Sequence, residues 1–182
     1  MKFLVTGGAG CIGSAFVRML LDSPAAWSGP AAQRPTVVAN FDKLTYAGNL
    51  ENLAPVAEDA RYRFVHGDIC DAALVNQTIA ETAPDVIVNF AAESHVDRSI
   101  MNAADFVRTN VLGTQVLLDA AREKKIGRFL HISTDEVGGS IPEGQFFSEE
   151  GRLSPSSPYA ASKTAAEGQV HEILRKHSAE IV

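Results

Sequence analysis

The sequence has few of the residues that mark several large classes of protein. Its 182 residues include only two cysteines, Cys11 and Cys70, which are too few for a disulfide framework and fit no metal spacing. No block of lysine and arginine exceeds two residues and the formal net charge is −6, which argues against nucleic acid or an anionic membrane as the partner. No apolar run approaches the length of a membrane span, and the glycines after Met1–Val5 come too early for a signal peptide.

These absences narrow the expected class of protein. The chain is 46% hydrophobic and 21% charged, which is typical of one globular domain. We expect a cytoplasmic protein with free thiols and no metal site, whose partner is a small molecule.

Apolar, β-branched runs alternate with helical periodicity along the chain, a pattern typical of βαβ units around a parallel sheet. The expected strands are Lys2–Thr6, Thr36–Phe41, Tyr62–His66, Val86–Phe90 and Arg128–Ser133. The expected helices are Ile12–Leu21, the segment from the N-cap Asp71 to about Thr82, Ala103–Lys125, and Tyr159 to about Lys176. This pattern predicts an α/β fold, a Rossmann-like doubly wound parallel sheet with helices on both faces.

Two segments fall outside that alternation. Ser23–Pro35 contains three prolines and is expected to be a surface insertion between the first helix and the second strand. Ala179–Val182 is expected to open a sixth strand. The chain is therefore expected to stop in the middle of a fold.

The segment Thr6–Gly13 ends an expected strand and opens an expected helix, the context in which a glycine-rich pattern predicts dinucleotide binding. Gly7 permits the tight turn, Gly10 lets the backbone approach a pyrophosphate, and Gly13 allows close packing of helix on strand. The helix N-terminus adds N–H donors and positive potential. The alternative is a glycine-rich turn without a ligand.

Asp42 follows the second expected strand, where a carboxylate accepts hydrogen bonds from an adenosine ribose and repels a 2′-phosphate. This position favours NAD over NADP, with a solvated loop aspartate as the alternative. Asp42 lies farther from the glycines than the usual spacing of about 20 residues. The insertion Ser23–Pro35 accounts for the excess.

Two further segments follow the third and fourth expected strands, His66–Ile69 and Phe90–His95. Because the carboxyl ends of parallel strands line one crevice, we expect both segments to meet the glycine loop. The small side chains of Ala91 and Ala92 would let a cofactor lie close. His95 taken alone is as readily a structural histidine.

Candidate acid and base groups follow the fifth strand and open the last helix. Ser133–Glu136 places two adjacent carboxylates at the crevice, and two carboxyls in different environments can serve as one acid and one base. Tyr159 and Lys163 are four residues apart and share one helix face. An ammonium beside a phenol favours the phenolate, which could deprotonate a sugar hydroxyl. A solvated acidic turn and a chance Tyr–Lys spacing are the alternatives.

With these motifs the sequence resembles the extended short-chain dehydrogenase/reductase superfamily and, within it, the dTDP-glucose 4,6-dehydratase family. The combination of Thr-Asp-Glu with Tyr-x-x-x-Lys is specific to the nucleotide-sugar dehydratases of that superfamily. The resembling segments run from one end of the chain to the other and are Thr6–Gly13, Asp42–Leu50, His66–Asp71, Ala91–Ile100, Thr109–Asn110, His131–Val137 and Pro158–Lys163.

The resemblance implies dehydration of dTDP-glucose to dTDP-4-keto-6-deoxyglucose, in deoxysugar biosynthesis, with NAD regenerated in each turnover. Tyr159, aided by Lys163, would take the 4-hydroxyl proton while the C4 hydride passes to NAD, and Thr134 would orient that hydroxyl. Glu136 would then remove the C5 hydrogen as Asp135 protonates the departing 6-hydroxyl. The hydride would return to C6.

The resemblance also implies binding roles. The expected cofactor-binding residues are Gly7, Gly10, Cys11, Ile12, Gly13, Asp42, Lys43, Leu44, Thr45, Asp68, Ile69, Phe90, Ala91, Ala92, Ser94, Thr109, Tyr159 and Lys163. The expected substrate-binding residues are Ser94, His95 and Thr134. A homodimer that pairs through the helices Ala103–Lys125 and Tyr159–Lys176 is implied as well.

The chain departs from the family in two respects. The family reads Val-Tyr-Gly after Thr-Asp-Glu, whereas Val137 is followed by Gly138 and Gly139, which removes an aromatic ring beneath the carboxylates and predicts a more mobile backbone. The family also continues into further strands and a C-terminal nucleotide-sugar-binding substrate domain, which are expected to be absent from this sequence, so residues 1–182 are expected to form the NAD-binding domain that carries the catalytic residues.

Two other functions stay open. One is an epimerase or decarboxylase of the same superfamily, although epimerases usually carry small hydroxyl residues in place of Asp135 and Glu136. The other is a non-catalytic NAD-binding module. Glu136 distinguishes the first of these from a dehydratase, because only a dehydratase needs a base for the C5 hydrogen.

Overall fold

A computed structural model of the chain describes residues 1–21, 34–141, 144, 146, 148, 150–177 and 180–181. Most of the predicted insertion Ser23–Pro35 lies outside these residues. In chain order the elements are β1 (Lys2–Thr6), α1 (Cys11–Leu21), β2 (Val37–Asp42), η2 (Leu50–Val56), β3 (Tyr62–His66), α2 (Ala72–Thr82), β4 (Val86–Asn89), α3 (Val96–Met101), α4 (Ala103–Phe106), η3 (Val107–Gly113), α5 (Thr114–Glu123), β5 (Arg128–His131), η4 (Asp135–Gly138), α6 (Pro158–His177) and β6 (Glu180–Ile181).

The strands form one parallel sheet in the order β3-β2-β1-β4-β5-β6. β1 lies between β2 and β4, with Thr6 opposite Phe41 on one side and opposite Asn89 on the other. The strand order reverses between β1 and β4, and a doubly wound sheet opens its crevice at such a switch point. The predicted fold class is confirmed, and the expected sixth strand pairs in parallel with β5.

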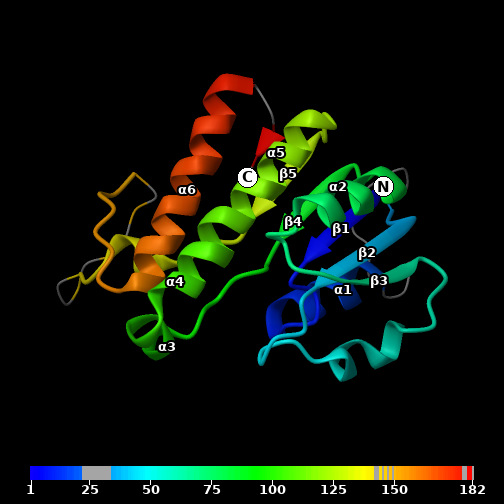
Figure 1. Cartoon of the computed structure of the whole chain (residues 1–182), viewed down its shortest axis with the longest axis horizontal. Coiled ribbons are helices and arrows are strands. Elements are labelled where there is room, and N and C mark those ends of the chain that lie inside the picture. Colours follow the sequence, from blue (N-terminus) through cyan, green and yellow to red (C-terminus); the bar gives the residue numbers. More distant parts are fainter. Residues whose placement is uncertain are drawn as a thin grey trace.

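Apolar clusters cover both faces of the sheet. Leu4 packs in a cluster with α2, α5 and α6, to which α5 contributes Leu117. Val5, the next residue of β1, packs in a second cluster with Val17 of α1 and Leu53 of η2. Successive side chains of a strand point to opposite faces, so β1 is buried from both sides. Figure 1 shows α5 and α6 running side by side on the first of these faces.

The helix predicted over Ala103–Lys125 is interrupted by the π-helical turn η3, which separates α4 from α5. Asn110 of η3 is buried, and its side-chain amide donates to the Glu93 carbonyl at 2.9 Å and to Ser162 Oγ at 2.8 Å. Its Oδ1 accepts from the Glu93 N–H at 2.8 Å. Apolar periodicity could not predict this turn, because a polar side chain and its partners hold it. Such turns often accompany functional sites.

Two strands end earlier than predicted. β4 ends at Asn89 instead of Phe90, and β5 ends at His131 instead of Ser133. Asn89 opposite His131 is the last pair of their ladder. The residues that follow this pair, Phe90, Ile132 and Ser133, line the cleft described below.

Other boundaries differ by a residue. β2 covers Val37–Asp42 instead of Thr36–Phe41, since Asp42 still pairs with His66 of β3. α1 begins at Cys11 and α6 at Pro158, one residue before the predicted starts. The predicted N-cap of α2 is confirmed, because the Asp71 side chain accepts from Leu74 N.

The short elements η2, α3 and η4 were not predicted. Each has seven residues or fewer, too few for apolar periodicity to mark a helix. In the described part of the chain, none of the helices combines the length and apolar character needed to cross a membrane.

Candidate active site

A cleft opens at the carboxyl ends of the strands on both sides of the switch point. The glycine loop, the segments after β2, β3, β4 and β5, and the first turns of α6 line it together. The predicted cofactor-binding residues that lie in this lining are Gly7, Gly10, Cys11, Ile12, Gly13, Asp42, Lys43, Thr45, Asp68, Ile69, Phe90, Ala91, Ala92, Ser94, Thr109, Tyr159 and Lys163.

Some predicted site residues lie outside this lining: Leu44, His95, Thr134, Asp135 and Glu136. Leu44 has a φ of 53° and packs against the cluster of Val5 and Val17, so its side chain is turned into the core. His95 is exposed and precedes α3 as an N-cap residue whose side chain makes no capping hydrogen bond. Consecutive residues of a loop face different directions, which segment-level prediction does not resolve.

Residues that line the cleft without having been named as site residues are Phe41, Ala47, Gly48, Ile132 and Ser133, whereas Gly67 and Glu93 lie there within the segments His66–Ile69 and Phe90–His95 that were expected to meet the glycine loop. Each lies within three residues of a predicted one. Gly67 illustrates why its residue type matters, because a Cβ there would lie 2.5 Å from Cζ of Phe41. The sequence feature that could have identified these residues is their position in a segment that directly follows a strand.

The glycine loop is held in a shape that side chains would prevent. Gly7 has a φ of 69°, and a Cβ on it would lie 2.6 Å from the Ala91 backbone nitrogen. A Cβ on Gly13 would lie 2.2 Å from the Gly7 carbonyl oxygen. Cys11 and Ile12, in the first turn of α1, face the cleft. The N–H groups of a first helical turn have no partner within the helix, which favours an anionic group here.

Asp42 fixes the two loops that meet at the cleft. Its side chain is buried, and Oδ2 accepts from Ala9 N at 2.9 Å while Oδ1 accepts from Leu44 N at 2.8 Å. A carboxylate oxygen can accept a second hydrogen bond, and Asp42 also lines the cleft. It can therefore hold the loops and still bind a hydroxyl.

The nearby cation Lys43 is engaged by a second carboxylate. Lys43 Nζ lies 2.9 Å from Asp68 Oδ2, and the Cys70 N–H donates to Asp68 Oδ1 at 2.9 Å. Burial acts to raise the pKa of Asp68, but the hydrogen bonds from Cys70 and Lys43 outweigh it and the pKa is lowered. Asp68 is therefore ionised and occupies the Lys43 ammonium.

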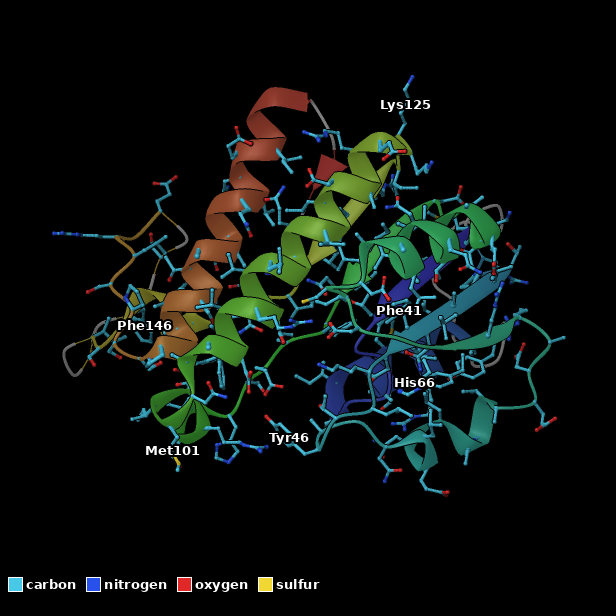
Figure 2. All side chains as sticks on the ribbon, viewed as in Figure 1. Phe41, Tyr46, His66, Met101, Lys125 and Phe146 are labelled. Atoms are coloured by element: carbon cyan, nitrogen blue, oxygen red, sulfur yellow. The ribbon has the colours of Figure 1, made fainter. Side chains whose placement is uncertain are left out.

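Aromatic and charged side chains meet at the mouth of the cleft. Tyr46 extends from the loop after β2 toward α3 (Figure 2), and its hydroxyl donates to Glu93 Oε2 at 3.1 Å. The Arg98 guanidinium of α3 lies 4.0 Å from the centre of the Tyr46 ring. These contacts connect the loop after β2 with the segment after β4.

Tyr159 stands half-buried at the start of α6, with its ring edge-on to Phe106 at 6.3 Å between centroids. Burial raises the pKa of the Tyr159 hydroxyl, a hydrogen bond with Thr134 opposes this, and the charges of Glu136 and Asp135 raise the pKa further. Thr134 and the two carboxylates therefore lie close enough to Tyr159 to act on its hydroxyl, although they do not line the cleft.

The phenolate expected beside Lys163 is not favoured here, because burial and the charges of Glu136 and Asp135 raise the pKa of Tyr159. Lys163 is 3% exposed, and its Nζ donates to the Ile132 carbonyl at 2.5 Å. Burial lowers the pKa of Lys163 to about 8, and the Glu167 carboxylate opposes that shift. The Lys163 ammonium is thus hydrogen-bonded to the backbone of the loop after β5.

The turn that carries the carboxylates is tied at both ends. Thr134 Oγ1 caps it by accepting from Glu136 N at 3.3 Å, and the Gly139 N–H donates to the Glu136 carbonyl at 3.1 Å. Gly139 has a φ of 77°, and a Cβ there would lie 2.1 Å from the Ser154 carbonyl. A side chain at Gly139 would therefore collide with the backbone of Ser154, so this position requires glycine. The greater backbone mobility expected from Gly138 stays a prediction.

A row of buried polar side chains crosses three adjacent strands below the cleft. Thr6 Oγ1 donates to Asn89 Oδ1 at 2.6 Å, and Asn89 Nδ2 lies 3.1 Å from His131 Nδ1. Burial, with a contribution from the Lys163 charge, lowers the pKa of His131 to about 3. The imidazole is therefore neutral at pH 7. Nothing in the sequence pattern indicated this row, since its members sit singly in apolar strands.

We expect His131 to make the fold sensitive to acid. Its folded pKa of about 3 lies below the ordinary 6.5, so the unfolded chain takes up the proton first and stability falls as pH drops from 6.5 toward 3. This shift corresponds to a loss of about 2 kcal/mol between pH 7.5 and pH 5. Urea unfolding of His131→Phe at both pH values should lack that loss. His171→Gln, which replaces an exposed histidine of α6, is the control and should lose as much stability as wild type. An equal loss of unfolding free energy between pH 7.5 and pH 5 in wild type and His131→Phe would contradict the assignment to His131.

Comparison with known proteins identifies the family to which the chain belongs. The model of the GDP-mannose 4,6 dehydratase family matches residues 4–182. The chain belongs to this family. A dTDP-glucose 4,6-dehydratase from Streptomyces niveus is 54% identical to it over 182 residues, which is the whole chain and 52% of that relative.

Solved structures of similar proteins have the same fold. A dTDP-glucose 4,6-dehydratase from Streptomyces venezuelae, solved with NAD bound, superposes with a TM-score of 0.91 at 50% identity over all of this chain and 54% of that one. A UDP-glucose 4-epimerase from Thermus thermophilus, in complex with NAD, superposes with a TM-score of 0.85 at 31% identity over 100% and 53%. The chain spans about half the length of the relatives it matches.

Proposed function

We propose that this chain is the NAD-binding and catalytic part of a dTDP-glucose 4,6-dehydratase, and that residues 1–182 form its NAD-binding domain. The observation that carries this proposal is the single cleft that brings the glycine loop, Asp42 and the Tyr159–Lys163 pair together. Relatives named dTDP-glucose 4,6-dehydratase at 54% and 50% identity support the choice of substrate.

The cleft lining fits NAD. The shape of the glycine loop brings the first turn of α1 to the cleft, where its N–H groups suit a pyrophosphate, and Asp42 suits the adenosine ribose. Lys43 is engaged by Asp68 at 2.9 Å, so its ammonium is not free to compensate a 2′-phosphate beside Asp42. We assign cofactor binding to the predicted residues that line the cleft. When bound, NAD supplies reversible acceptance of a hydride.

Asp42 should set the preference between the two dinucleotides. We expect Asp42→Asn to reduce the preference for NADH over NADPH by about tenfold or more, since the repulsion of the 2′-phosphate is removed. Fluorescence titration of both dinucleotides gives the two dissociation constants. The control is Asp85→Asn, an aspartate that also accepts a backbone N–H, from Lys2 at 2.7 Å, outside the cleft lining. A ratio of the two constants in Asp42→Asn that equals the wild-type ratio would refute the role.

The residues around Tyr159 can perform the proton transfers of a dehydration. Tyr159 Oη, whose pKa Thr134 influences, would take the proton of the sugar 4-hydroxyl, and Lys163 would support it from the next helical turn. Glu136 would remove the C5 proton that the 4-ketone acidifies, and Asp135 would protonate the departing 6-hydroxyl. The two carboxylates have different surroundings, because Asp135 is exposed and Glu136 is partly buried, and carboxyls in different environments can serve as one acid and one base.

Ser94, His95 and Thr134 are proposed to contact the sugar. Ser94 lines the cleft directly. His95 follows it at the exposed start of α3, and Thr134 lies beside the Tyr159 hydroxyl.

We also propose a homodimer formed through α4, η3, α5 and α6. Apolar side chains more than half exposed gather on α3 and η3, namely Ile100, Met101, Val107 and Leu112, and Figure 2 shows Met101 projecting at the edge of the molecule. A cytoplasmic location is proposed because Cys11 and Cys70 are free thiols, which persist in reducing compartments.

The function is tested by incubating the chain with NAD and dTDP-glucose and following the sugar nucleotide by mass spectrometry. Loss of one water supports the dehydratase. An unchanged mass with a rearranged sugar would indicate an epimerase instead. An unaltered sugar nucleotide, with NAD bound in the same sample, would favour the second candidate, a cofactor-binding module. The exposed position of Asp135 supports this alternative.

A further inference from the structure

Glu167 continues the face of α6 on which Tyr159 and Lys163 lie. The three residues are spaced by four along the helix, so they stand one above another. Glu167 is partly buried and belongs to neither the glycine loop nor the acidic turn. It has no role in the proton transfers described above.

A residue of the cleft holds the Glu167 carboxylate in place. Ser133 Oγ, in the loop after β5, donates a hydrogen bond to Glu167 Oε1. Ser133 lines the cleft, as does Lys163. The hydrogen bond therefore fixes a negative charge on α6 behind two residues of the cleft wall.

Lys163 occupies a site where an ammonium needs such a charge. It is 3% exposed, and Nζ donates to the Ile132 carbonyl at 2.5 Å. A buried charge is costly unless it is compensated. A single neutral carbonyl compensates it only in part.

The titratable groups around Lys163 come from three elements. His131 faces it from β5 with a neutral ring, and Tyr159 precedes it on α6 with Asp135 and Glu136 of η4 beside that phenol. The packed turn η3 contributes the neutral amide of Asn110 through Ser162. Burial lowers the pKa of Lys163, and Glu167 is the group whose charge opposes this.

We propose that Glu167, fixed by the Ser133 hydroxyl, is a positioning residue that keeps Lys163 protonated in the wall of the cleft at neutral pH. The consequence for catalysis rests on the proposed function, since an ammonium at Lys163 is what would support Tyr159. The protonation of Lys163 itself does not rest on that function.

The proposal is tested by following the Cε resonance of Lys163 during a pH titration of the chain labelled with ¹³C-lysine, without dinucleotide. The resonance is assigned as the one missing in Lys163→Met. In Glu167→Gln we expect the midpoint to move to lower pH by about one pH unit or more, because a nearby opposite charge is removed. Ser133→Ala should move it in the same direction by less, and Glu167→Asp should restore most of the wild-type midpoint.

The control is Glu123→Gln, which removes a carboxylate from the exposed end of α5 and should leave the Lys163 midpoint unchanged. A midpoint in Glu167→Gln equal to that of wild type would overturn the proposal. If Glu167→Gln did not fold, Ser133→Ala would decide, with an unshifted midpoint overturning it. Since no dinucleotide is present, failure of NAD binding or of sugar dehydration leaves this result separately interpretable.

Discussion

Gly13→Ala should abolish measurable NAD binding and destabilise the fold. The added Cβ would lie 2.2 Å from the Gly7 carbonyl oxygen and 2.9 Å from Cα of Gly8. Because both neighbours are backbone, the loop and α1 must move apart. We expect a loss of about 1–3 kcal/mol in the free energy of unfolding, as for overpacking elsewhere. Two lost hydrogen bonds to a pyrophosphate would weaken NAD about 100-fold or more.

The chain contains a matched glycine for this experiment. Gly168 lies on the exposed side of α6, and a Cβ there meets nothing within 4 Å. Gly168→Ala should therefore stabilise the fold by about 0.5–1 kcal/mol, because alanine loses less conformational entropy in a helix. Its NAD affinity should equal that of wild type in calorimetric titration. Gly13→Ala that binds NAD as wild type does would show that the loop does not hold the cofactor.

Tyr159→Phe should lower the rate of dTDP-glucose dehydration about 10²–10⁴-fold, the usual contribution of a positioned acid or base. The variant keeps the ring that packs edge-on against Phe106 and removes only the hydroxyl beside Thr134. The raised pKa of Tyr159 means that the phenolate fraction grows with pH. The wild-type rate should therefore rise with pH above neutrality, and the variant should lack that rise. Single-turnover measurements across the alkaline range test both statements.

Tyr62→Phe is the control for this loss. Tyr62 is also a partly buried tyrosine, but it lies on β3, where its hydroxyl accepts from Asn40 Nδ2 at 3.1 Å. Its removal should leave the dehydration rate within a fewfold of wild type. A Tyr159→Phe variant as active as Tyr62→Phe would remove Tyr159 from the chemistry.

The order of strands and helices could be predicted because the strands carry short apolar runs, such as Phe3–Val5 of β1, which is buried on both faces of the sheet. β1 and β3 match their predicted bounds, and the remaining strands differ at their ends, where pairing stops for reasons that lie in other strands. The π-helical turn at η3 could not be predicted, since Asn110 is held by Glu93 and Ser162, which are 17 and 52 residues away in the chain.

The candidate site follows the same division. Glycine spacing and the ends of parallel strands predicted the segments that line the cleft, because those features are local in sequence. The direction of each side chain is not local, and for that reason Leu44 and His95 lie outside the cleft lining although their neighbours are part of it. The neutral state of His131 and the hydrogen bond from Ser133 to Glu167 depend on contacts between elements, so no local sequence pattern predicts them.

The most direct test of the central claim, that this cleft holds NAD, is a ¹⁵N-resolved NMR titration of the chain with NAD. We expect saturable shifts of the backbone amides of Gly10, Cys11 and Ile12, with smaller shifts at Asp68 and Ala92, all of which line the cleft. Amides at the amino ends of the strands, such as that of Val86, should not move. Shifts absent from the glycine loop, or confined to another face of the molecule, would contradict NAD binding in this cleft.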